Sequence, residues 1–145
     1  MLTIEQIHAI KYETEPNRGI KIGDGADCDV YAVNDLCVRV FTVNPLKVLY
    51  YCYIGIMHHY HGCGFIGGFE VFVVDIERLE PINQATFLEL HLDNKGQVYK
   101  RFPDLVRFVE DNNITAVYDA WHKNVMRHPL TGVIIDIDSL YFSLT

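Results

Sequence analysis

The stretch Ile20–Phe41, IKIGDGADCDVYAVNDLCVRVF, decides the expected fold of this chain. It opens with a strand that runs into a glycine turn at Gly25, and Val30–Val33 and Leu36–Phe41 are β-branched or aromatic runs typical of strands. The pair Asn34–Asp35 between those runs favours a tight hairpin, because both residue types tolerate a positive φ. The stretch therefore predicts neighbouring antiparallel strands.

Outside this stretch, helices and strands alternate irregularly, which is typical of an α+β fold. Apolar residues recur at three- and four-residue spacing from Pro45 to about Tyr60, and Asn44 suits the cap of a helix there. Glycines from Gly62 to Gly68 end this helix and lead into an antiparallel pair. That antiparallel pair is expected at Phe65–Leu79. The other expected elements are a short helix or edge strand at Ile4–Tyr12, helices at Asn83–Leu90 and Pro103–Asp111, a strand or turn at Ile114–Tyr118, and a last hairpin strand at Val133–Ile135.

Composition limits the class of protein. The 145 residues carry 12 Lys+Arg against 19 Asp+Glu, a formal charge of −7 that argues against non-specific nucleic-acid binding. No repeat or linker divides the chain, so we expect a single domain over residues 1–145. The most apolar stretch, Val48–Met57, is too short to span a bilayer, and no signal peptide is evident, so no membrane partner is expected. We expect a cytoplasmic protein whose four cysteines are free thiols.

The glycine turn, GDGADCDV at Gly23–Val30, is a candidate phosphate-binding element. Glycines let backbone amides approach a polyphosphate closely, and Val30 can cover an apolar base. Most such turns are simply hairpin turns, and three aspartates in this one oppose a bound anion unless a cation is present. Arg39 in the following apolar strand points either to solvent or into the cleft beneath the turn.

The second candidate element is Asp119-Ala-Trp-His-Lys-Asn124, followed by Asp136-Ile137-Asp138 after a β-branched run. A carboxylate five residues before an amide, with another carboxylate at the end of a strand, can assemble hard oxygen ligands for Mg²⁺ and leave a separate base. This spacing is more specific than the glycine turn.

Taken in order from Gly23 to Asp138, these features resemble the protein-kinase-like superfamily, including its aminoglycoside-phosphotransferase and small bacterial or phage relatives. The resemblance implies a kinase N-lobe over residues 1–80, an antiparallel sheet with one inserted helix. It also implies a reduced helical C-lobe over residues 81–145 that carries the catalytic-loop hairpin. Only seven residues follow Asp138, so we expect a kinase core without a peptide-substrate lobe.

The resemblance also implies a role for each candidate residue. ATP would be bound by the glycine turn through Gly23, Gly25 and Val30, by Arg39 on the α- and β-phosphates, and by Glu77 and Leu79 at the adenine. Asp119 would orient or deprotonate the acceptor hydroxyl, and Lys123 would help neutralise the transferred phosphoryl group. Asn124, Asp136 and Asp138 would hold Mg²⁺. The expected function is ATP-dependent phosphoryl transfer to a protein or small-molecule hydroxyl.

Some residues favour a different function. Arg39 stands where the family has Lys, and Pro45–Tyr60 contains no Asp or Glu to pair with it. The alternative is a catalytically inactive, pseudokinase-like module that binds or inhibits a partner, such as a host protein if the chain is a phage product, in the host cytoplasm. The crowded tyrosines Tyr50, Tyr51, Tyr53 and Tyr60 are compatible with such a partner surface or with a homodimer.

A dense group of possible metal ligands, His58, His59, His61 and Cys63, lies at the end of the expected helix. A structural Zn²⁺ needs three or four of these donors to converge tetrahedrally. The other interpretation is simply a polar helix end.

Overall fold

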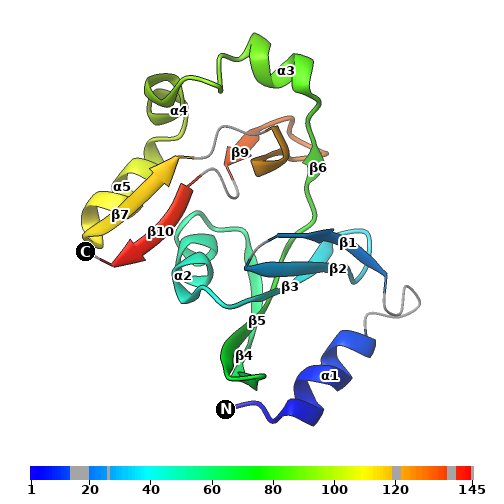
Figure 1. Ribbon diagram of the computed structural model, residues 1–145. Helices are drawn as coiled ribbons and strands as arrows, with labels where there is room; N and C mark the ends of the chain where they lie inside the picture. Colours follow the sequence, from blue (N-terminus) through cyan, green and yellow to red (C-terminus); the bar gives the residue numbers. More distant parts are fainter. Residues whose placement is uncertain (14–19, 26, 119–121, 137–139, 145) are drawn as a thin grey trace. The chain divides into compact units, whose positions relative to one another are not determined.

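In the computed structural model, the chain divides into two compact units, Met1–Arg78 and Leu79–Thr145. The structure describes residues 1–13, 20–25, 27–118, 122–136 and 140–144. Both units combine helices with antiparallel strands, which confirms the expected α+β class (Figure 1). Among the helices of this described part, none is long and apolar enough to cross a bilayer.

The first unit is built on a five-stranded antiparallel sheet with the order β1-β2-β3-β5-β4. Its elements are α1 (Ile4–Tyr12), β1 (Lys21–Asp24), β2 (Cys28–Ala32), β3 (Cys37–Thr42), α2 (Pro45–Tyr53), β4 (Met57–Ile66) and β5 (Phe69–Glu77). Helix α2 lies between β3 and β4 in the chain, so the expected antiparallel sheet with one inserted helix is present.

Local sequence explains the first hairpin of the sheet. The Asn34 side-chain Oδ1 accepts a hydrogen bond of 2.7 Å from the Leu36 backbone N–H, a side-chain turn that reverses the chain between β2 and β3. The register then pairs Val30 with Val40 and Tyr31 with Arg39. The predicted hairpin is therefore confirmed, but its expected cause is wrong, because neither Asn34 nor Asp35 has a positive φ.

The N-terminal segment is a helix and not an edge strand. Thr3 Oγ1 accepts a hydrogen bond from the Gln6 backbone N–H, and Gln6 Oε1 accepts one from the Thr3 N–H, which together form a capping box. Helix α1 then buries Ile7 completely against Phe41 of β3 and Val73 of β5.

Side chains on β3 alternate between the two faces of the sheet. Phe41 faces α1, so Arg39, two residues away, lies on the same face. Val40 and its partner Val74 face the other side, where α2 lies (Figure 1). This alternation determines which elements Arg39 can reach.

The expected helix from Pro45 to about Tyr60 is wrong at its C-terminal end. Helix α2 starts as predicted, with Asn44 Oδ1 accepting from the Leu46 N–H at 3.0 Å, but it ends at Tyr53. Gly55 has a φ of 78°, a left-handed conformation that favours glycine and ends helices. The Ile56 N–H donates to Tyr51 O and the Gly55 N–H to Cys52 O, both at 3.1 Å, which is the Schellman pattern. The histidine-rich segment after Gly55 is therefore strand β4.

The second unit contains three helices and two small antiparallel sheets, one of β7 with β10 and one of order β6-β8-β9. Its elements are β6 (Glu80–Pro81), α3 (Gln84–Glu89), α4 (Lys95–Arg101), α5 (Pro103–Asp111), β7 (Ile114–Tyr118), the 3-10 turn η1 (His122–Asn124), β8 (Val125–Arg127), β9 (Ile134–Asp136) and β10 (Leu140–Leu144). The predictions of α3, α5 and the hairpin strand β9 are confirmed, whereas α4, β8 and β10 were not predicted.

Candidate functional site

The glycine turn joins β1 to β2 in the first unit. The Gly25 N–H donates to Cys28 O at 2.8 Å, and the Val43 N–H donates to Asp27 O at 3.0 Å. A Cβ added at Gly23 or Gly25 would meet its nearest neighbour, Val30 Cβ or Cys28 Sγ, at 3.7 Å, an ordinary contact. Packing therefore does not require glycine at either position.

The acidic residues of the glycine turn have lysine partners. Lys47 of α2, only 1% exposed, places its Nζ 2.8 Å from Asp27 Oδ1. The exposed Lys21 lies 3.6 Å from Asp24 and 3.8 Å from Asp29. These two lysines offset part of the negative charge of the three aspartates. Sequence reasoning missed Lys47, although it is the one charged residue in the otherwise apolar α2.

Arg39 is buried, with 8% of its surface exposed, and does not point to solvent. Its Nε and Nη2 donate to the two carboxylate oxygens of Asp75 at 2.7 and 3.1 Å, and Nη1 donates to Ile10 O at 3.1 Å. The guanidinium thus forms a bidentate pair with the neighbouring strand and also binds the end of α1. A role for Arg39 on phosphates stays a prediction.

Asp75 is the centre of a charged cluster on the α1 face of the sheet. Its Oδ2 is also hydrogen-bonded to His61 Nε2 at 2.9 Å. Burial alone raises the pKa of Asp75, but the hydrogen bonds and charges of Arg39 and His61 outweigh it and hold the pKa below its ordinary value of 3.8. Asp75 is therefore a carboxylate at neutral pH.

The two residues expected at the adenine lie at the end of the first unit and the start of the second. Glu77 ends β5, and its carboxylate pairs with the His58 ring. Leu79 follows Arg78, at the start of the second unit, and is half-buried. The structure therefore gives Glu77 a partner within the sheet.

The backbone places two of the expected metal-binding residues near each other in the second unit. Asn124 ends η1 and directly precedes β8, while Asp136 ends β9. The β8–β9 register pairs Val125 with Asp136, so Asn124 and Asp136 lie at the same end of one hairpin. Lys123, which directly precedes Asn124, is exposed. Asp119 and Asp138 lie outside the described residues.

The histidine-rich patch does not form the tetrahedral site considered from the sequence. His58 pairs with Glu77 and His61 with Asp75, and the rings of His59 and His61 stack edge to face at 4.5 Å. Within the described ranges, no group of three or more His, Cys, Asp or Glu side chains is arranged to hold a metal ion.

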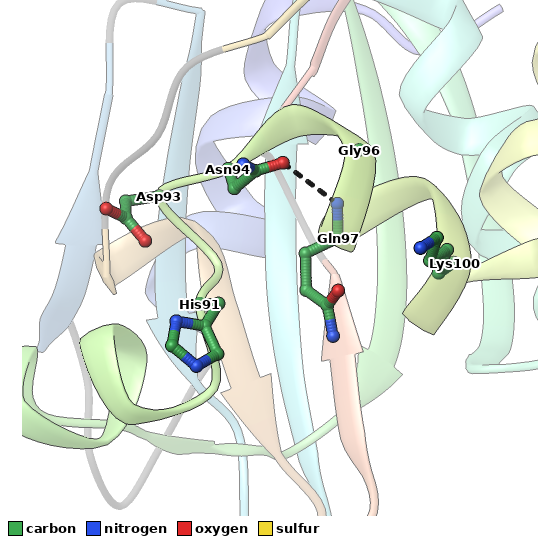
Figure 2. Close-up of a pocket in the computed structure, with 6 residues that line it drawn as sticks. All are labelled: His91, Asp93, Asn94, Gly96, Gln97 and Lys100. Carbon is green, nitrogen blue, oxygen red and sulfur yellow. Dashed lines mark hydrogen bonds between the residues drawn. The ribbon is translucent and has the colours of Figure 1, made fainter.

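An open polar hollow of about 400 Å³ lies in the second unit and was not predicted. Figure 2 shows the Asn94 side chain of this hollow accepting a hydrogen bond from the Gln97 N–H, at 3.2 Å, at the start of α4. The hollow contains none of the residues expected to bind ATP or Mg²⁺. The residues that line it are His91, Asp93, Asn94, Gly96, Gln97 and Lys100.

All four cysteines are free thiols, as expected. Cys37 on β3 is buried, and this burial, assisted by the negative charge of Asp75, raises the pKa of its thiol to about 11. Cys52 on α2 is exposed. Since the thiolate is the reactive form, the two residues should differ strongly in reactivity.

We expect iodoacetamide at pH 8 to alkylate Cys52 and to leave Cys37 unmodified in the native protein. Peptide mass spectrometry at successive times measures both rates in one sample. The same reaction in urea serves as the control, because unfolding should make the two rates similar. Equal rates in the native protein would show that β3 is not buried as described.

Comparison with known proteins adds no family to these observations. No protein-family model matches the chain, and no curated protein matches it in a sequence search. The function is therefore inferred from the residues and from the geometry of each unit.

Proposed function

We propose that this protein is kinase-like, binds ATP with Mg²⁺ and transfers a phosphoryl group to a hydroxyl of a protein or small molecule. The observation that carries the proposal is the β8–β9 register, which pairs Val125 with Asp136 next to Asn124. In the family that the sequence resembles, the residues that correspond to Asn124 and Asp136 both coordinate the metal ion. Their position at one end of a hairpin supports the same role here.

The chemistry of these two residues fits Mg²⁺. An amide oxygen from Asn124 and a carboxylate from Asp136 are hard oxygen donors, which Mg²⁺ prefers. When bound, the ion would neutralise charge on the phosphates. Lys123, exposed and adjacent to Asn124, is suited to pair with the transferred phosphoryl group. Asp119 is proposed to orient the acceptor hydroxyl, and Asp138 to assist in holding the metal.

Features of the first unit also support a kinase-like N-lobe. A five-stranded antiparallel sheet contains one helix between β3 and β4, and a glycine turn joins the first two strands. Neither Gly23 nor Gly25 is required by packing, which is compatible with a role in close approach of a ligand. Lys21 and Lys47 offset two of the three aspartate charges at the turn.

The test is a thermal-shift titration with ATP, with and without Mg²⁺, on the full chain. A ligand at 100 times its Kd stabilises the native state by about 2.7 kcal/mol, so we expect Mg²⁺ and ATP together to raise Tm by several degrees. Asp136→Ala should lose most of this shift. Asp111→Ala, which changes an exposed aspartate at the end of α5, is the matched control and should keep it. No shift of the wild type at millimolar ATP would contradict the proposal.

A second candidate function, a pseudokinase-like module that binds a protein partner or a second copy, is favoured by one observation. The guanidinium of Arg39 is bound to Asp75 and Ile10 O, and α2 carries no acidic residue. A thermal shift with ATP but no transfer of radiolabelled phosphate would favour this candidate. Transfer that disappears in Asp136→Ala would exclude it.

A further inference from the structure

We propose that His122 is a positioning residue for the metal site of the second unit. Its ring holds the turn η1 in place, and through this turn it holds the backbone of Asn124 beside Asp136. The inference rests on the proposed function, because it requires that Asn124 and Asp136 hold Mg²⁺ with ATP. It gives a role to a residue of the Asp119–Asn124 segment to which the sequence pattern assigned none.

The ring of His122 is hydrogen-bonded to a backbone carbonyl far away in the sequence. Its Nδ1 lies 3.3 Å from Ile82 O, 40 residues earlier in the chain. A carbonyl oxygen can only accept a hydrogen bond, so Nδ1 must carry the proton and donate it. The ring is half-buried. This bond therefore connects η1 to the segment between β6 and α3.

The carbonyl that accepts this bond belongs to a segment that is held on both sides. Ile82 is 4% exposed and directly follows β6, whose Pro81 pairs with Met126 of β8. The next residue, Asn83, caps α3, because its Oδ1 accepts a hydrogen bond of 2.8 Å from the Thr86 N–H. Ile82 O is therefore a fixed point to which the ring can bind.

The turn η1 benefits from a contact of this kind. It has only three residues, His122–Asn124, and the internal hydrogen bonds of a 3-10 turn have poorer geometry than those of an α-helix. Strand pairing fixes the chain after the turn, where Val125–Arg127 of β8 pair with β6 and β9. The His122 ring fixes the chain at the start of the turn. Asn124 lies between these two points, so its backbone position is determined from both sides.

The position of Asn124 matters because Mg²⁺ requires nearly ideal octahedral coordination. Residues of a binding site must be held within about 0.5 Å of their productive positions. Groups that orient a metal ligand from behind typically contribute about 10- to 100-fold to metal affinity. His122 acts through the backbone and not directly on the Asn124 amide, so we expect an effect at the lower end of this range.

The first experiment measures the affinity of the full chain for ATP by calorimetry, once with Mg²⁺ and once with EDTA. His122→Phe keeps a ring of similar size and removes the Nδ1 donor. It should weaken binding of Mg²⁺-ATP about 10-fold and leave binding of ATP in EDTA unchanged, because only the metal complex uses Asn124.

Two further variants separate the hydrogen bond from the bulk of the ring. The side-chain amide N–H of Asn lies about as far from the backbone as Nδ1 of His, whereas that of Gln lies about as far as Nε2. His122→Asn should therefore restore most of the affinity for Mg²⁺-ATP, and His122→Gln should not.

His128→Phe is the matched control. His128 is also half-buried and bound to backbone, because its Nδ1 accepts from the Leu130 and Thr131 N–H groups at 3.2 and 3.3 Å. It lies at the other end of the β8–β9 hairpin from Asn124. Its replacement should leave the affinity for Mg²⁺-ATP unchanged.

A second experiment tests the hydrogen bond without any nucleotide. NMR of the ring nitrogens in the ¹⁵N-labelled protein shows which nitrogen of His122 carries the proton, and we expect Nδ1. In His122→Phe the backbone amide signals of Asn124 and Val125 should shift, and in His122→Asn they should return towards those of the wild type.

Three results would overturn the inference. If Nδ1 carries no proton, the bond to Ile82 O does not form. If His122→Phe binds Mg²⁺-ATP like the wild type, the ring does not position Asn124. If Phe, Asn and Gln at this position all weaken binding equally, His122 only fills space. A wild type that does not bind Mg²⁺-ATP would instead refute the proposed function, and this inference with it, even where Nδ1 carries the proton.

Discussion

Replacing Asp75 with Asn is expected to lower the free energy of unfolding by about 3 to 5 kcal/mol, because it leaves a buried guanidinium without its counter-ion. The side chains of Arg39 and Asp75 are 9% and 12% exposed and form a bidentate pair. Water can therefore hardly compensate for the lost carboxylate. Urea unfolding followed by circular dichroism measures the change.

Two further variants show whether the lost charge is the cause. Asp24→Asn removes an aspartate of the same unit that is 70% exposed and paired with Lys21, and it should cost less than about 1 kcal/mol. The double variant Arg39→Met/Asp75→Leu removes both charges and should recover much of the stability. If Asp75→Asn and Asp24→Asn cost the same, the buried pair does not stabilise the sheet as described.

The same pair predicts a dependence of stability on pH. The pKa of Asp75 in the folded state lies below its ordinary value of 3.8, so between these two values the unfolded chain binds more protons. Stability from Asp75 is therefore present above pH 3.8 and is lost as the pH falls through the folded pKa. Asp75→Asn should lack this part of the acid transition.

Replacing Gly64 with Ala is expected to cost about 3 kcal/mol, the upper part of the usual range for overpacking. A Cβ on Gly64 would lie 2.1 Å from Leu2 O and 2.8 Å from Ile7 Cδ1. Leu2 pairs with Gly64 in a parallel bridge, and Ile7 is fully buried. The clash should therefore displace the N-terminal segment, which hydrogen exchange of residues 1–13 would detect together with the loss of stability.

Gly23→Ala is the matched control for this variant, because Gly23 is also a strand glycine of the same sheet. Its added Cβ would meet Val30 Cβ at 3.7 Å, so the free energy of unfolding should change by less than about 1 kcal/mol. If both variants lose a similar free energy of unfolding, the close contact with Leu2 is not the reason why position 64 requires glycine.

Elements of the fold with a strong local signal were predictable. The turn at Asn34 and the start of α2 at Pro45 depend on side chains that bond within two residues of themselves. The end of α2 was not predictable from its apolar spacing, because that spacing continues to Met57. There, pairing with β5, a contact distant in sequence, outweighs the local helical pattern. Helix α4, KGQVYKR, has only Val98 and Tyr99 as apolar residues, so it shows no helical apolar spacing.

In the candidate site, too, some features follow from the local sequence and others depend on contacts that are distant in the sequence. The proximity of Asn124 and Asp136 follows from a hairpin whose β-branched strand is visible in the sequence. The partners of Arg39 and Lys47 are 36 and 20 residues away, at Asp75 and Asp27. They are set by strand register and by the position of α2 at the turn. Neither pairing has a sequence spacing that predicts it.

The most direct test of the proposed function is to replace Mg²⁺ with paramagnetic Mn²⁺ and record the amide signals of the ¹⁵N-labelled protein with ATP. If Asn124 and Asp136 hold the metal with the nucleotide, the signals of Asn124, Val125 and Asp136 should broaden when both Mn²⁺ and ATP are added. Asp136→Ala should largely abolish this broadening. Unchanged signals at these residues, or broadening confined to the polar hollow at His91–Lys100, would contradict a kinase-like metal and nucleotide site.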